Sequence, residues 1–153
     1  MKEELLKDEI WLLARAIAEG LEDTLAPAAA ESGLTLTQAR LLICCAHQPD
    51  LTAGELSRRT GIAAANISSM CKRLERDGLL QRLRDPQDER LVHIRLTERG
   101  EAAMQAMDAA IAARYGRALG EEDPEELAQI MAGLQKLGAL LKRLNRKPAG
   151  AGE

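Results

Sequence analysis

Apolar residues in the first thirty positions recur at steps of three and four, the spacing of one face of an amphipathic helix. The stripe consists of Leu6, Ile10, Leu13, Ile17, Leu21 and Leu25. Pro27 follows it, and proline removes a helical hydrogen-bond donor and crowds the preceding turn. We therefore predict a long first helix that Pro27 kinks or stops.

A second helix is predicted between this stripe and Pro49. Thr37 is placed to cap its start, and Leu41 and Leu42 lie on its apolar side. We expect the helix to end at Gln48, because the residue before a proline resists helical dihedral angles.

Two further helices are predicted in the last third of the chain. Thr97 is placed to cap a long helix that reaches about Leu119. Asp123-Pro124 marks the start of the last helix, with an acidic cap before proline, and an apolar stripe continues to Leu144. The small residues of the segment 147–153 predict a disordered tail.

Residues 51–77 carry the pattern of two short helices joined by a tight turn. Thr52 and Glu55 have the spacing of a capping box, in which a hydroxyl and a carboxylate each bond an exposed amide. Gly61 is placed to end that helix, and the second helix is expected over residues 63–77. These are the proportions of a helix-turn-helix, whose second helix enters the major groove of DNA.

Residues 80–96 carry the alternation of a half-exposed ribbon. Strands are predicted over residues 80–84 and 91–96, joined by a turn at residues 85–88. Arg90 lies near the tip, and an arginine on a thin loop suits the narrow, electronegative minor groove. We expect Asp88 either to orient Arg90 or to pair with another basic residue such as Arg73.

Composition and charge sharpen this picture. Hydrophobic residues make up 46% of the 153 positions and aromatic residues only 1%, which favours packed helices. The net charge is −3, yet residues 51–100 hold 10 Lys and Arg against 7 Asp and Glu, or +3, which leaves −6 for the remainder. A basic segment in an acidic chain is typical of a localised DNA footprint, although an ordinary mixed surface also fits.

The fold prediction is mainly α with a small β-wing. The alternative for residues 51–96 is a small helical hairpin with a polar outer face, next to a solvated ribbon. If the segment binds DNA, the expected contacts come from the exposed polar and basic side chains of its helices and ribbon. These are Thr52, Asn66, Ser68, Ser69, Lys72, Arg73, Arg82, Arg84, Asp88 and Arg90.

Several short motifs occur together in this part of the chain. They are Leu51-Thr52, Glu55-Leu56, Gly61-Ile62, Asn66-Ile67-Ser68, Arg73-Leu74-Glu75, Gly78-Leu79, Arg82, Asp85-Pro86, Asp88-Glu89-Arg90 and Leu96-Thr97-Glu98-Arg99-Gly100. With these motifs the chain resembles the MarR-type winged-helix transcriptional regulators. The flanking helices extend the resemblance over nearly the whole chain.

The resemblance implies one MarR-type domain over residues 1–153, with a winged helix-turn-helix head at 36–100. Residues 1–30 and 101–146 would form dimerisation helices, and the homodimer would read a pseudo-palindrome on double-stranded DNA. Such regulators commonly repress transcription and release DNA when a small molecule or an oxidant changes the spacing of the heads. The apolar stripes of the outer helices, larger than one head could cover, independently predict a partner surface.

The sequence departs from the family pattern in the second helix of the helix-turn-helix. Ala63 stands where the family usually has a capping residue, and losing such a cap typically costs about 1 kcal/mol. Ser69 stands where the family often has arginine, which predicts weaker or differently placed base recognition. Lys72 replaces a frequent acid and is expected to contact phosphate.

An effector site is a further expectation. Residues near the junction of head and dimer helices mix a ring, cations and soft groups: Trp11, Arg15, Arg40, Cys44 and His47. Ordinary packing and surface roles are the alternative for each of them. Cys44 or Cys45 could sense oxidants, although the oxidant-sensing branch has its cysteine nearer the N-terminus and buried helical cysteine is the default.

Other classes of protein are less compatible with the sequence. It shows no nucleophile paired with histidine, no phosphate loop and no metal-ligand spacing, so we expect neither an enzyme nor a cofactor. The polar N-terminus and the lack of long apolar runs predict a cytoplasmic protein without a membrane partner. One alternative remains, a winged-helix interaction module that binds a partner regulator, which would not need Arg84 and Arg90 exposed.

Overall fold

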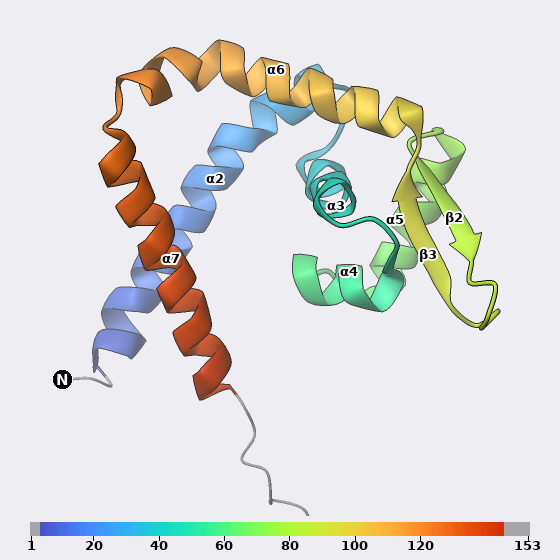
Figure 1. The fold of residues 1–153 in the computed structure, drawn as a ribbon, viewed down its shortest axis with the longest axis horizontal. Helices are drawn as coiled ribbons and strands as arrows, with labels where there is room; N and C mark the ends of the chain where they lie inside the picture. The colour runs from blue at the N-terminus through green and yellow to red at the C-terminus, as the bar shows by residue number, and fades with distance from the viewer. Residues whose placement is uncertain (1–3, 146–153) are drawn as a thin grey trace, which may run out of the picture. The chain divides into compact units, whose positions relative to one another are not determined.

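The computed structural model describes residues 4–145, apart from the side chains of residues 5–7. The chain divides into two compact units, residues 1–114 and 115–153. The first unit holds a helical core with a small antiparallel sheet, and the second holds the end of helix α6 and helix α7 (Figure 1). The tail predicted at residues 147–153 lies outside the described residues.

The first helical segment is longer and more continuous than the sequence predicts. A π-helical turn, η1 (Leu5–Ile10), leads directly into α2 (Trp11–Glu31). The prediction that Pro27 stops this helix was wrong, because α2 continues for another turn beyond Pro27. Ala28, Ala29 and Ala30 favour helix, and the end is closed where the amide of Leu34 donates to the carbonyl of Ala29 at 2.9 Å.

Helix α3 (Leu36–His47) begins two residues earlier than predicted. Thr35, not Thr37, is the cap. Its hydroxyl accepts the amide of Gln38 at 3.2 Å, and the Gln38 side chain accepts the amide of Thr35 at 2.9 Å. Thr35 also has the extended conformation of a cap (ψ 155°), so this capping box determines the start of the helix.

The head continues with α4 (Ala53–Thr60), α5 (Ala64–Arg76), β2 (Leu80–Arg84) and β3 (Val92–Leu96). The sequence predicts these elements to within one or two residues. It does not predict β1 (Leu51–Thr52), which pairs antiparallel with β3 and makes the ribbon a three-stranded sheet in the order β1-β3-β2. In Figure 1 the β2–β3 hairpin projects beyond α5 as the wing.

The core of the first unit lies between the helices and the inner face of this sheet. Its fully buried side chains come from the end of α2, from α3, α4, α5, α6 (Glu98–Glu121) and from all three strands. The largest are Leu41, Leu42, Leu51, Leu56, Ile67, Cys71, Leu74, Leu80, Ile94 and Met107. This packing fixes α5 and the wing to the same core.

Helices α2 and α7 leave many apolar side chains exposed. In α2, apolar side chains are exposed, with Trp11 at 59% and Leu13 at 62%. In the second unit, α7 (Pro124–Leu144) has no buried residue, and Ile130 and Met131 are more than half exposed. Within residues 4–145, no helix combines the length and apolar character needed to cross a membrane.

Candidate nucleic-acid interface

The turn between α4 and α5 is held by side chains of α4. Gly61 takes the left-handed conformation (φ 71°), as predicted. The hydroxyl of Ser57 donates to the carbonyl of Ile62 at 2.6 Å, and the buried hydroxyl of Thr60 donates to that of Leu56 at 2.7 Å. The Ser57 hydrogen bond thus ties the turn that leads into α5 to the side chains of α4.

Helix α5, the candidate recognition helix, has one buried and one exposed face. The buried face carries Ile67, Cys71 and Leu74. The exposed face carries Ala64, Ala65, Asn66, Ser68, Ser69, Lys72 and Arg73. Ala63 occupies the cap position and makes no side-chain cap hydrogen bond. The helix therefore offers short polar groups near its start and cations farther along.

A hollow of about 440 Å³ joins the start of α4, helix α5 and the wing. Four of the predicted contact residues line it: Thr52, Ser68, Arg82 and Arg90. Thr52 is also the cap of α4, since its hydroxyl accepts the amide of Glu55 at 3.3 Å and donates to the Glu55 carboxylate at 2.9 Å. Residues from three separate elements thus meet on one surface of the head.

The wing loop is shaped by two aspartates. The Asp85 carboxylate accepts the amides of Gln87 at 2.7 Å and Asp88 at 3.1 Å. The Asp88 carboxylate accepts the backbone amide of Arg90 at 3.0 Å. Of the two roles predicted for Asp88, this contact favours the first, because within residues 4–145 no ion pair joins Asp88 to Arg73.

Some basic side chains of the head are held by acidic partners and others are not. Arg82 pairs with Glu75, Arg95 with Asp50 and Arg40 with Glu22, so these guanidinium groups are partly neutralised. Among the described residues, no ion pair involves the exposed side chains of Lys72, Arg73, Arg84 or Arg90. These four side chains can meet phosphate without losing an ion-pair partner.

The residues suspected of binding an effector lie on two helices, α2 and α3. Trp11 and Arg15 are exposed on α2, where Arg15 pairs with Glu19 at 2.9 Å. Arg40 donates to the carbonyl of Thr60 at 3.2 Å and supports the turn. Cys44 is half-buried and His47 exposed on α3. None of these five lines the hollow beside the wing or either of two other hollows among the described residues.

Three comparisons place this geometry among known proteins. A MarR family model matches residues 32–91. The chain is 26% identical to the HTH-type transcriptional repressor MdtR of Bacillus subtilis, over 93% of this chain and 94% of the relative. A solved MarR family protein from Bacillus stearothermophilus has a TM-score of 0.73 at 28% identity, over 93% of this chain and 99% of that one.

The helix-turn-helix and most of the wing thus match the MarR family, and most of the chain is similar to MarR-family proteins. The matching relatives that carry a functional name are transcriptional regulators and repressors. A mutant MepR from S. aureus, solved bound to an oligodeoxyribonucleotide, has a TM-score of 0.59 at 25% identity, over 86% of this chain and 97% of that one. The alternative of a protein-interaction module is not favoured.

The structure adds five residues that the sequence analysis did not place in the site: Glu75, Asp50, Arg95, His93 and Asp85. Glu75 holds Arg82, Asp50 holds Arg95, and His93 lies between Asp50 and Asp85. Asp50 has a positive φ of 63°, which is uncommon outside glycine. The signal in the sequence was weak, because three of these contacts join residues 7, 43 and 45 positions apart.

Proposed function

We propose that this chain is a MarR-family transcriptional regulator that binds duplex DNA as a homodimer, recognises a pseudo-palindromic operator and represses transcription. The observation that carries the proposal is the group of exposed, unpaired cations on the head. Lys72 and Arg73 lie on α5, and Arg84 and Arg90 lie on the wing. In this arrangement α5 lies in the major groove while the wing reaches the adjacent minor groove.

The proposed contacts divide by chemistry. Asn66, Ser68 and Ser69 are short donors and acceptors placed for base edges, while Lys72 and Arg73 are placed for phosphate. Ser69 stands where the family often has an arginine, which could donate two hydrogen bonds to guanine. Affinity would therefore depend heavily on contacts with phosphate, on the wing and on the pairing of two heads. Repression is consistent with the name of the relative MdtR.

The exposed apolar side chains of the outer helices support the homodimer. Trp11, Leu13 and Leu21 on α2 are each more than half exposed in the single chain. On α7 of the second unit, Ile130, Met131 and Leu144 are exposed to a similar degree. Apolar surface of this extent on an isolated chain marks an interface, and two-fold pairing would bring two heads onto half-sites about one helical turn apart.

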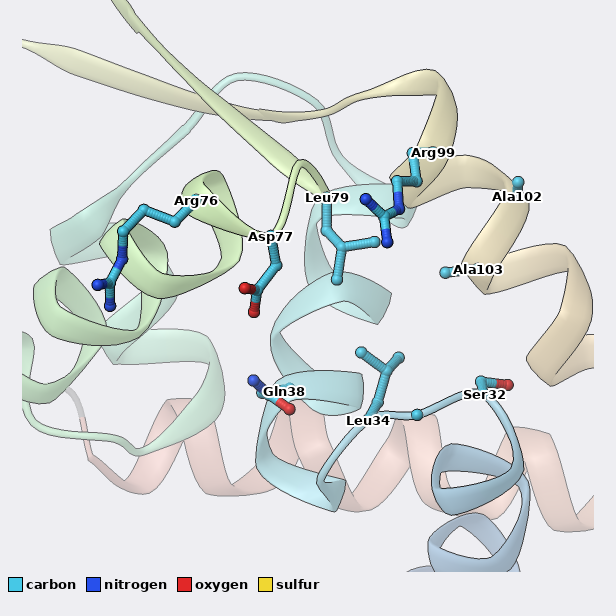
Figure 2. Close-up of a pocket in the computed structure, with 10 residues that line it drawn as sticks. Ser32, Leu34, Gln38, Arg76, Asp77, Leu79, Arg99, Ala102 and Ala103 are labelled. Atoms are coloured by element: carbon cyan, nitrogen blue, oxygen red, sulfur yellow. The ribbon is translucent and has the colours of Figure 1, made fainter.

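A response to a small molecule is the second part of the proposal. A hollow of about 680 Å³ lies between the α2–α3 turn, the end of α5 and the start of α6. Figure 2 shows the Asp77 carboxylate and the Arg99 guanidinium facing this space, opposite Leu34 and Gln38, while Arg76 extends away. No ion pair of the described residues uses Asp77 or Arg99. An amphipathic ligand bound here would contact the end of the recognition helix directly.

A mobility shift at low salt tests DNA binding. The probe is duplex DNA from upstream of the chain's own gene, with a scrambled duplex of the same composition as control. We expect a shift of the upstream probe at lower protein concentration than the scrambled probe. A folded dimer, confirmed by sedimentation, that shifts neither probe would contradict the proposed function.

The ligand response is tested separately by thermal denaturation. Small aromatic carboxylates are suitable probes, because Arg99 could bind the carboxylate while Leu34 and Leu79 contact the ring. We expect a rise in melting temperature that the substitution Arg99→Ala abolishes. The same rise in Arg99→Ala would show that the compounds bind elsewhere.

A further inference from the structure

His93 lies in the middle of the sheet with a hydrogen-bond partner on each ring nitrogen. It pairs with Thr52 of β1 on one side and with Leu83 of β2 on the other. Its Nδ1 atom is 2.9 Å from the carbonyl oxygen of Asp50, in the connection between α3 and β1. Its Nε2 atom is 2.8 Å from Oδ2 of Asp85, at the base of the wing loop.

Both partners can only accept hydrogen bonds. A backbone carbonyl has no proton, and the Asp85 carboxylate already accepts the amides of Gln87 and Asp88 in its ionised form. A neutral imidazole carries one N–H and could satisfy only one of these partners, whereas imidazolium carries two. Both hydrogen bonds therefore form together only when His93 is positively charged.

We propose that charged His93 is a positioning residue that holds the wing loop in the geometry needed to contact DNA. The path of contacts is short. His93 holds Asp85, Asp85 holds the amides of Gln87 and Asp88, and Asp88 holds the amide of Arg90. When His93 loses a proton, one of its two hydrogen bonds breaks. Loss of the Nε2 proton releases the wing loop that presents Arg90, and loss of the Nδ1 proton releases the Asp50 carbonyl and with it one support of the His93 ring. The inference rests on the proposed binding of DNA.

The charged groups around His93 make Asp85 its main partner. From the α3–β1 connection comes Asp50, whose carboxylate is held by Arg95 of β3 at 2.8 Å. From the wing comes Asp85, which no other described cation pairs with. The flanking residues of β1 and β2, Thr52 and Leu83, are uncharged. The nearby carboxylate of Glu55 is engaged by Thr52 in the α4 cap.

The direction of the pH effect follows from these contacts. The hydrogen bond to Asp85, and then that to the Asp50 carbonyl, raises the pKa of His93 above its ordinary 6.5. The contribution of charged His93 is thus complete below pH 6.5 and is lost as the pH rises through the raised pKa. Hydrogen bonds from His93, Gln87 and Asp88 lower the pKa of Asp85 from 3.8, so its contribution is lost only in stronger acid.

The first test uses the free protein and needs no DNA. The chain has two histidines, so His47→Gln assigns the His93 signals in an NMR titration. We expect His93 to titrate above 6.5, and the amides of Gln87, Asp88 and Arg90 to shift with the same midpoint. Wing amides that do not follow the His93 titration would overturn the proposal.

The second test measures affinity for the upstream duplex across pH 5.5–9. We expect affinity to fall by roughly threefold to tenfold as His93 deprotonates, the effect of about one hydrogen bond. His93→Gln, shown by circular dichroism to be folded, should bind at the weaker level at every pH, and His47→Gln should match the parent. His93→Lys separates position from charge, because it retains a cation without the two contacts.

Three outcomes have distinct meanings. Full affinity in His93→Lys at every pH would show that charge near phosphate is sufficient, and the positioning role would be wrong. A pH-independent affinity of the parent would also overturn it. Failure to bind DNA at any pH, while the wing amides follow His93, would refute the proposed function but not the control of the loop by His93.

Discussion

The Glu75 carboxylate at the end of α5 makes three contacts with Arg82 of β2. Its Oε2 atom accepts the Arg82 Nε–H at 2.8 Å and lies 2.8 Å from Nη2, while its Oε1 atom accepts the Arg82 backbone amide at 3.2 Å. The pair thus ties the candidate recognition helix to the wing. Arg82 was predicted to contact DNA, and these contacts give it a second role, which is to fix the angle between two DNA-binding elements.

The substitution Glu75→Gln should reduce DNA specificity more than it reduces stability. The two side chains are 36% and 35% exposed, so solvent screening leaves the ion pair about 0.5 kcal/mol of stability. Freed from Glu75, Arg82 can meet phosphate on any sequence, while the wing loses its fixed angle to α5. We expect the ratio of affinities for the upstream and scrambled duplexes to fall.

Glu19→Gln is the matched control, because it breaks the exposed Arg15–Glu19 pair of α2 far from the proposed contacts in sequence. It should leave both affinities unchanged. An unaltered specificity ratio in Glu75→Gln would show that the angle between wing and helix does not depend on this pair.

Arg90→Ala should weaken binding to all DNA sequences and flatten its dependence on salt. Arg90 is exposed at the wing tip, and its guanidinium has no ion-pair partner within the described part of the chain. Removing one phosphate contact should lower the slope of log affinity against log salt by about 1. Arg117→Ala, which removes an exposed cation of the second unit, is the control. Equal slopes for Arg90→Ala and the parent would contradict contact with phosphate.

The sequence predicts best those features whose partners lie close together along the chain. The capping box of Thr52 and Glu55 spans three residues, and the structure contains it as predicted. Gly61 and Asp123 likewise act on their immediate neighbours. The end of α2 was missed because proline only disfavours helix, and the capping box at Thr35 was a second local signal that competed with Thr37.

Features that depend on tertiary packing could not be predicted. The strand β1 has only two residues, and it exists because β3 offers an unpaired edge. The pair of Asp50 and Arg95 spans 45 residues, so no periodicity in the sequence indicates it. The suspected effector residues were chosen because they combine an aromatic ring, cations and soft groups, and none of them lines the hollow beside Asp77 and Arg99. That hollow is formed by segments that the sequence does not place together.

Leu13→Glu should dissociate the proposed dimer. Leu13 is 62% exposed on α2, and a buried unpaired carboxylate at an apolar interface would be strongly unfavourable. We expect sedimentation to show a monomer, with DNA affinity lost in parallel. Leu91→Glu alters an apolar residue of the wing that is 43% exposed, and it should leave the oligomeric state unchanged. A Leu13→Glu dimer would exclude this part of α2 from the interface.

Two of the three thiols should react slowly in the folded protein. Burial, together with the neighbouring Cys71 and Cys44, raises the pKa of Cys45 to about 12. Burial raises the pKa of Cys71 to about 11. Because the thiolate is the reactive form, a disulfide reagent at pH 8 should label at most Cys44 quickly, and all three thiols only after unfolding.

Cys44→Ser should remove any fast phase of labelling, and the parent treated with mild oxidant should keep its affinity for DNA. Rapid labelling of Cys45 in the folded protein, accompanied by release of DNA, would contradict this prediction and support redox sensing.

Two glycines of α6 should respond to alanine in opposite directions. A Cβ atom at Gly100 would lie 2.1 Å from the carbonyl oxygen of Leu79 and 3.2 Å from Cδ2 of Leu96. The Leu79 carbonyl cannot easily move, because it accepts the amide of Thr97 at 3.1 Å. At Gly116 a Cβ atom would meet nothing within 4 Å. Gly100→Ala should therefore cost about 3 kcal/mol of unfolding free energy.

Gly116→Ala should instead gain up to about 1 kcal/mol, the difference in helix propensity between the two residues. Urea denaturation of both variants and the parent measures these changes. Because Gly100 fixes the approach of α6 to the β2 end of the wing, Gly100→Ala should also weaken DNA binding under conditions in which it remains folded. Equal stabilities for the two variants would mean that α6 can shift away from Leu79, and that the wing does not depend on this contact.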